Sequence, residues 1–158
     1  MPERPTPDLD ESKLYRATVT TDRGTIVMDL DPRLAPMTVG NFVGLAQQGY
    51  YDGLTFHRVV PDFVIQGGCP EGTGTGGPGY RFPDEPVQAE YTLGAVAMAN
   101  AGPDTNGSQF FICIDDCRRK LAPSYNLFGY VVEGMDVALA VRVGDVMRTV
   151  VIEAVDRV

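Results

Sequence analysis

One short segment sets the architecture of this chain: Phe56-His57-Arg58-Val59-Val60-Pro61-Asp62-Phe63-Val64-Ile65-Gln66-Gly67-Gly68. Residues 55–60 and 63–66 are rich in β-branched and aromatic side chains, which fit the pleated, half-buried surface of a strand. The Pro-Asp pair between them is favoured in tight turns, because proline presets the backbone and aspartate bonds locally. The segment therefore predicts a β-hairpin.

An arginine and a glutamine interrupt this apolar hairpin. Arg58 is a permanent cation close to Phe63 and Val64, and an unpaired buried charge is costly, so it must be hydrogen-bonded, half-exposed or functional. Gln66 is a suitable partner, because its side-chain oxygen can accept from the guanidinium while its amide still donates. These residues alone also fit an ordinary surface arginine on a strand, and both interpretations stay open at this point.

A second segment, further along the chain, narrows the choice. It reads Met98-Ala99-Asn100-Ala101-Gly102-Pro103-Asp104-Thr105-Asn106-Gly107-Ser108-Gln109-Phe110-Phe111-Ile112, and alone it would be generic. Together with residues 56–68 at this spacing, it resembles the signature of the cyclophilin family of peptidyl-prolyl cis-trans isomerases. The resemblance continues in residues 74–77 and 131–135 and runs from about Val19 to the C-terminus.

The remaining pattern predicts many short strands and two helices. Residues 15–21 and 25–30 alternate around Asp22-Arg23-Gly24, and residues 93–99, 109–114, 126–132 and 149–155 predict further strands. Apolar residues at helical spacing predict a helix from Pro36 to about Gly49 and another over 135–143, where Val137, Leu139, Ala140 and Val143 are apolar. Because strands and helices do not alternate as in βαβ units, the pattern favours an antiparallel barrel or a β-sandwich and does not distinguish the two. The resemblance implies a closed eight-stranded antiparallel barrel with an α-helix over each open end.

The bulk composition is that of one water-soluble domain. At 158 residues, we expect a flexible tail over residues 1–13 and a single domain over 14–158. A net charge of −8 argues against nucleic acid or anionic membranes as partners. No apolar run approaches the roughly 20 residues of a membrane helix, and the polar start resembles neither a signal nor a transit peptide. We expect a cytoplasmic protein, and a monomer because nothing signals an interface.

Two further patterns suggest cofactors, and neither is convincing. Cys69, Cys113 and Cys117 cannot all pair within one chain, and with His57 they match no zinc module, so we expect free thiols and no metal. Residues 72–77 satisfy the dinucleotide fingerprint GxGxxG, but prolines and glycines follow where a helix would have to begin. We therefore expect a glycine-rich loop at the edge of a peptide groove, and no cofactor.

The resemblance implies a reaction that needs no nucleophile. Rotation about an X–Pro bond breaks amide resonance, at a cost of about 18–20 kcal/mol. At the twisted transition state the proline nitrogen gains a usable lone pair, so a donor aimed at it binds that state selectively. By resemblance, Arg58 is the catalytic donor and Gln66 holds the guanidinium and the substrate in place.

The resemblance also implies where a substrate lies. The proline ring would occupy an apolar pocket, Asn100 and Ala101 would pair with the substrate backbone, and Gln109 would be the polar group beside them. The pocket positions are Phe63, Val64, Phe111, Leu121 and Tyr125. Strict alternation cannot place Phe63 and Gln66 on one face, so the chain has to bend near Phe63. His57 would face the opposite side of a regular strand, and we interpret it as structural.

The match weakens over residues 111–128. Many eukaryotic cyclophilins have a tryptophan just before the pocket leucine, whereas this chain has no tryptophan and Lys120 precedes Leu121. Tyr125 stands where those eukaryotic cyclophilins often have a histidine, and Val64 stands where they often have a methionine. The tryptophan is associated with tight cyclosporin binding in the family, so we expect weak binding of that drug.

The sequence thus predicts an isomerase that turns X–Pro bonds in protein substrates and assists protein folding. The alternative is a binding module or chaperone for proline peptides in which isomerisation is incidental, and a third interpretation is a barrel without activity. A pure binder would not need Arg58, which favours the enzyme.

Overall fold

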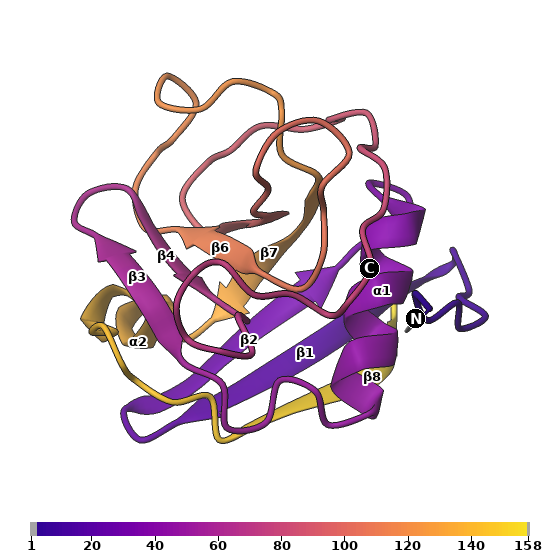
Figure 1. The fold of residues 1–158 in the computed structure, drawn as a ribbon. Helices are drawn as coiled ribbons and strands as arrows, with labels where there is room; N and C mark the ends of the chain where they lie inside the picture. The colour runs from indigo at the N-terminus through magenta and orange to yellow at the C-terminus, as the bar shows by residue number, and fades with distance from the viewer. Residues whose placement is uncertain (1–2, 158) are drawn as a thin grey trace.

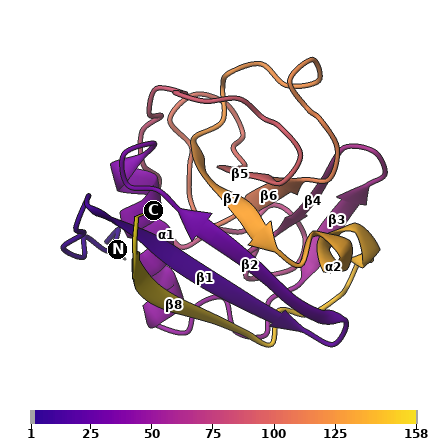
Figure 2. The same cartoon turned by 180° about the vertical axis from the view of Figure 1, so that it is seen from behind.

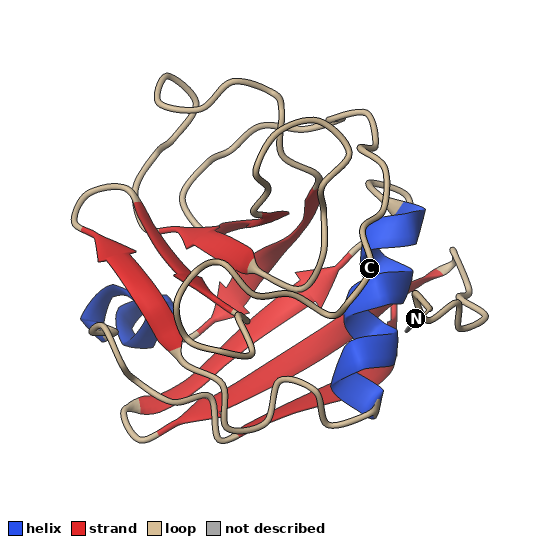
Figure 3. Cartoon of the chain, viewed as in Figure 1, coloured by secondary structure: helices blue, strands red, loops and turns tan. Residues whose placement is uncertain are grey.

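The computed structural model describes residues 3–157, which form one curled antiparallel sheet and two helices (Figures 1 and 3). The eight strands lie in the order β3-β4-β6-β5-β7-β2-β1-β8. In chain order the elements are β1 (Lys13–Thr21), β2 (Gly24–Leu30), α1 (Pro36–Gln47), β3 (Phe56–Val60), β4 (Val64–Gly67), β5 (Ala95–Met98), β6 (Phe110–Cys113), β7 (Leu127–Glu133), α2 (Met135–Ala140) and β8 (Thr149–Asp156). The predicted strands are confirmed to within about two residues at most ends.

The sheet is strongly curled, as the ribbon shows from both sides (Figures 1 and 2), and its edge strands are β3 and β8. The residues that lead into β3 bond to those that lead into β8, through the bridge between Thr55 and Val146. Met147 N–H donates to Leu54 O at 2.8 Å, and Phe56 N–H donates to Asp145 O at 2.9 Å. The predicted eight antiparallel strands and two helices are therefore confirmed, and the curled sheet is joined at its edges through these two short segments rather than by pairing of β3 with β8.

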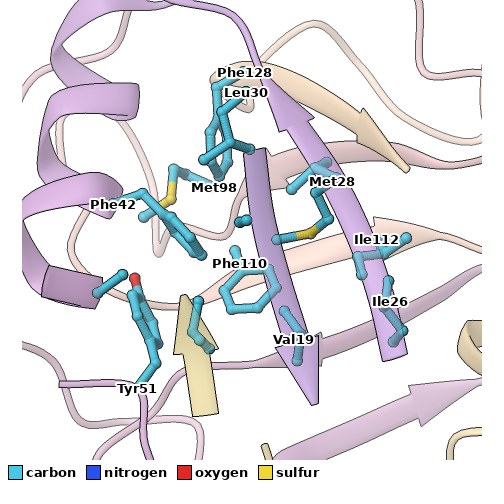
Figure 4. Close-up of a cluster of buried hydrophobic side chains, with 14 of the residues drawn as sticks. Val19, Ile26, Met28, Leu30, Phe42, Tyr51, Met98, Phe110, Ile112 and Phe128 are labelled. Atoms are coloured by element: carbon cyan, nitrogen blue, oxygen red, sulfur yellow. The ribbon is translucent and has the colours of Figure 1, made fainter. Parts of the chain in front are cut away.

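The core fills the inside of this barrel (Figure 4). Along β1, buried residues such as Val19 alternate with partly exposed ones. In β2, Ile26 and Met28 belong to a short buried run. The inward face of both strands is therefore apolar. From α1, Phe42 stacks on Tyr51 at 4.7 Å between ring centroids and meets Phe110 edge-on at 5.3 Å. These aromatic contacts anchor α1 to the core beside β6.

The two helices differ in how well the sequence predicted them. Helix α1 begins at Pro36, as expected of a residue that lacks the N–H which a first turn leaves unpaired. Helix α2 ends at Ala140, three residues earlier than predicted, because the Arg142 N–H bonds to Asp145 Oδ2 at 2.9 Å in a turn. Of the apolar residues in the predicted helix, Val137 packs against the core, whereas Leu139 is 55% exposed and Val143 66% exposed.

Residues 3–12 contain no helix or strand and lie along α1. Pro5 packs against Gly44, and the Arg4 guanidinium lies 5.9 Å from the centre of the Phe82 ring. The flexibility of this tail and the domain limits stay predictions. Among residues 3–157, no helix combines the length and the apolar character that crossing a membrane requires.

The connections β4–β5, β5–β6 and β6–β7 are long, and Figure 1 shows them gathered above the sheet at the top of the view. Glycines dominate residues 67–79, which form no helix after Gly77. The dinucleotide-binding interpretation of residues 72–77 therefore lacks the helix that it requires, as expected.

Candidate active site

The hairpin β3–β4 bends where the sequence required it. Asp62 adopts a left-handed backbone with φ of 59°, and Phe63 N–H donates to Val60 O at 3.1 Å, which closes the turn. Phe63 therefore stands in the turn, before the regular strand begins at Val64. It escapes the alternation of β4 and lines the same cavity as Gln66, so the predicted bend is confirmed.

A second irregularity, which the sequence did not predict, lies at His57. The pairing of β3 with β4 shifts between Phe56 and Arg58, so His57 is the extra residue of a bulge. As a result His57 lines the cavity beside Arg58, and its expected place on the opposite face was wrong. Partial burial, and then the Arg58 charge, lower the pKa of His57 below its ordinary value.

Arg58 is held by a line of hydrogen bonds that crosses the sheet. Its Nη1 donates to Gln66 Oε1 at 3.1 Å, as predicted, and Gln66 Nε2 donates to Gln109 Oε1 at 3.1 Å. Gln109 Nε2 in turn donates to the carbonyls of Gly74 and Gly76, both at 2.9 Å. We call this line the glutamine relay.

The direction of the glutamine relay is fixed by its far end. The carbonyls of Gly74 and Gly76 can only accept, so Gln109 must present its amide nitrogen to them and its oxygen to Gln66. Gln66 must then donate to Gln109, which leaves its own oxygen free to accept from a cation. The glycine-rich loop thereby orients Arg58 through two intervening side chains.

Beside Arg58 lies an open cavity of about 480 Å³. Val64 and Phe111 form its floor, since they are only 2% and 4% exposed. The Tyr125 ring meets the Phe111 ring edge-on, with 5.4 Å between the centroids. The residues that line the cavity are His57, Arg58, Phe63, Val64, Gln66, Thr73, Gly74, Ala99, Asn100, Phe111, Leu121 and Tyr125. The cavity thus combines an apolar floor with one cationic rim.

Ala101 and Gln109 lie outside this cavity and line a neighbouring hollow of about 870 Å³. Asn100 borders both, and its side chain is fixed: Nδ2 donates to Ser124 O at 2.9 Å, and Oδ1 accepts from Gly102 N–H at 3.2 Å. No described residue bonds to the main-chain N–H or C=O of Asn100, whereas Ala101 N–H donates to Thr105 Oγ1. At Asn100, therefore, both the main-chain N–H and the C=O are free to pair with a peptide.

Sequence reasoning missed His57, Thr73, Gly74 and Ala99 as cavity residues. The glycine-rich composition of residues 67–79 did indicate a loop beside the groove, but the bulge at His57 has no local sequence signal. The three cysteines are free, and burial raises the pKa of Cys113 and Cys117. Residues 3–157 hold no cluster of three His, Cys, Asp or Glu side chains that could bind a metal ion.

Comparisons with known proteins identify the family. Residues 16–157 match the family described as cyclophilin type peptidyl-prolyl cis-trans isomerase/CLD. Peptidyl-prolyl cis-trans isomerase B of Bacillus subtilis is 50% identical over 134 residues, which cover 84% of this chain and 93% of that protein. A peptidyl-prolyl cis-trans isomerase of Helicobacter pylori is 44% identical over 144 residues, covering 89% and 88%.

Solved structures show the same relationship. A cyclophilin type isomerase of Cryptosporidium parvum superposes with a TM-score of 0.82 at 30% identity, over 89% of this chain and 98% of that one. The same protein crystallised in the presence of the dipeptide Ala-Pro gives a TM-score of 0.80 at 31% identity, over 87% and 98%. A family match over nearly the whole chain, bacterial relatives of similar length and a shared fold lead to one conclusion: this chain belongs to the cyclophilin family and is a peptidyl-prolyl cis-trans isomerase.

Proposed function

We propose that X–Pro bonds turn in the 480 Å³ cavity, with Arg58 as the catalytic residue. The observation that carries this proposal is the glutamine relay, which fixes a cation at the rim of an apolar pocket. A guanidinium has five N–H donors, and within residues 3–157 only Nη1 of Arg58 makes a hydrogen bond, to Gln66. The other donors are available to a substrate.

Arg58 acts on the proline nitrogen at the twisted transition state. A hydrogen bond from a charged donor is worth about 1.5–3 kcal/mol net, which corresponds to about 10- to 150-fold in rate. The planar amide nitrogen of either ground state has no free lone pair, so the donor favours the transition state over both. Gln66 supports Arg58 by limiting the orientations of its guanidinium.

The remaining acceleration comes from holding the proline ring while the preceding carbonyl rotates. Val64 and Phe111 are nearly buried and form a rigid floor, and Phe63, Leu121 and Tyr125 surround it. The free main-chain groups of Asn100 can pair with the substrate backbone as one further strand residue would. A fixed ring and a fixed backbone on one side confine rotation to the bond that must turn.

This site supports a range of proline-containing proteins as substrates and a role in protein folding. The Cryptosporidium relative was crystallised in the presence of Ala-Pro, and an open cavity with few polar groups suits such minimal recognition. Lys120, in place of the aromatic residue of many eukaryotic relatives, supports weak binding of cyclosporin. The free cysteines favour the reducing cytoplasm, and we propose a monomer there.

A single sample can test the site and separate an enzyme from a binding module. An Ala-Pro tetrapeptide is added to ¹⁵N-labelled protein, and exchange between the cis and trans peptide signals is measured alongside the amide shifts. We expect shifts around residues 58–66, 100 and 109–125, together with exchange far faster than the tens of seconds of the free peptide. Ala-Ala peptide is the control and should cause neither. Binding shifts without faster exchange would leave only the binding module, and shifts elsewhere would overturn the site.

A further inference from the structure

The outer wall of the proposed proline pocket is a segment without helix or strand. Residues 114–126, which we call the wall loop, connect β6 to β7 and carry Leu121 and Tyr125. The sheet ladder does not hold these residues, so their position depends on individual tethers from other parts of the chain. A residue that supplies such tethers would control how well the pocket grips a proline ring.

Tyr91 supplies tethers to two points of the wall loop. Its main-chain carbonyl accepts from Cys117 N–H at 2.8 Å. Its hydroxyl donates to Tyr125 O at 2.6 Å and accepts from Tyr125 N–H at 3.2 Å. Tyr91 is only 4% exposed and does not line the cavity; its ring belongs to the same buried cluster as Val64 and Phe111, and its hydroxyl acts on the wall loop.

The hydroxyl of Tyr91 is the main-chain anchor of Tyr125. Within residues 3–157, it makes the hydrogen bonds of both the N–H and the C=O of Tyr125, and no other group bonds to either. Burial raises the pKa of Tyr91 to about 12, so the hydroxyl keeps its proton and can donate at neutral pH. The ring of Tyr125, placed by this anchor, then packs edge-on against Phe111 in the pocket floor.

We propose that Tyr91 is a positioning residue, which holds the wall loop so that Leu121 and Tyr125 close on the proline ring. This inference rests on the proposed function, because that function places the ring in the cavity. Val64 and Phe111 in the floor still hold the ring when the wall is loosened, and the wall itself contacts the ring equally in the ground state and the transition state. Weakening such uniform binding raises KM and leaves kcat nearly unchanged.

The test is Tyr91→Phe, which removes the hydroxyl and keeps the buried ring. We expect KM and the peptide Kd to rise about three- to tenfold while kcat stays within about twofold of wild type. The matched control is Tyr130→Phe, because the Tyr130 hydroxyl donates to Glu90 O at 2.7 Å and makes no bond to the wall loop. The control should keep the wild-type KM. A lower kcat with an unchanged KM would overturn the proposal. General destabilisation would give that result, because it reduces the amount of active protein without raising KM.

A double-mutant cycle checks that Tyr91 acts through the side chain of Tyr125. In the Tyr125→Ala background, Tyr91→Phe should change KM less than it does in wild type. Its effect on the free energy of unfolding should be similar in both backgrounds, because the main-chain bonds to residue 125 exist in both. Equal KM effects in the two backgrounds would contradict the mechanism. If Arg58→Ala and Tyr125→Ala both leave activity intact, the proposed site itself has failed; if they lower it and Tyr91→Phe does not, only this inference has failed.

Discussion

Replacing Gln66 by leucine tests the glutamine relay. Leucine has a similar volume but can neither accept from Arg58 nor donate to Gln109. Because Arg58 is exposed, its 3.1 Å bond to Gln66 contributes little to stability, about 0.5–1 kcal/mol. The bond instead fixes the orientation of the Arg58 side chain, and ordering a free arginine side chain costs up to about 2 kcal/mol of conformational entropy. In Gln66→Leu, this ordering happens only in the transition state and therefore raises the activation free energy.

A cost of about 1–2 kcal/mol at the transition state lowers kcat/KM about 5- to 30-fold. Gln66→Glu is the informative companion. Its carboxylate still accepts from Arg58 but has no proton for Gln109 Oε1, and Gln109 cannot turn because Gly74 and Gly76 hold its amide nitrogen. We therefore expect Gln66→Glu to lose activity as well, although it keeps an anchor for the cation.

The assay is the rate of cis–trans exchange in an X–Pro peptide at several peptide concentrations. Urea unfolding of each variant serves to check that the fold is retained. Gln88→Leu is the matched control, because Gln88 Nε2 also donates to main-chain carbonyls, those of Arg33 and Leu34, outside the groove. Folded Gln66→Leu protein with a kcat/KM within twofold of wild type would refute the relay.

Three further predictions concern stability, a thiol and drug binding. Glu85→Ala should lower the free energy of unfolding by about 2–3 kcal/mol, because the buried carboxylate accepts from the N–H groups of Met37 and Thr38 at the start of α1. The measurement is urea unfolding, and a loss below about 0.5 kcal/mol would contradict this. Burial raises the pKa of the Cys69 thiol, but main-chain N–H donors of its loop outweigh burial and lower the pKa to about 7. The ultraviolet thiolate signal should therefore grow as pH rises through about 7 and be absent from Cys69→Ser. Lys120→Trp should bind cyclosporin at least about tenfold more tightly, because an added aromatic contact is worth about 1.4 kcal/mol. The Kd is measured by calorimetry, and an unchanged Kd would count against placing residue 120 at the tryptophan position of the eukaryotic relatives.

Local sequence patterns were sufficient for most of the barrel. Alternation and turn chemistry act between neighbours, so the hairpin β1–β2 and the turn at Pro61-Asp62 could be predicted from their own residues. The pairing of Arg58 with Gln66 was predictable for the same reason, because both lie in one short hairpin. Helix α2 was overextended because apolar spacing continued through Val143, whereas the chain turns at Arg142.

The features that could not be predicted from the sequence depend mainly on contacts between distant parts of the chain. Glu85 caps α1 from 48 residues away, and Tyr91 holds Tyr125 from 34 residues away, so no window of sequence contains either pair. The bulge at His57 follows from the fit of β3 to β4 and has no glycine to signal it. The wall loop lacks periodicity, and Leu121 was assigned through family resemblance alone.

The account depends most on Arg58 as the donor to the proline nitrogen. The most direct measurement is kcat/KM for an X–Pro peptide with Arg58→Ala, compared with wild type and with Arg33→Ala, which removes an exposed arginine outside the groove. Circular dichroism is used to check that all three proteins are folded. We predict a loss of about tenfold or more in Arg58→Ala and none in Arg33→Ala. Folded Arg58→Ala protein that turns over the peptide at the wild-type rate would contradict the account.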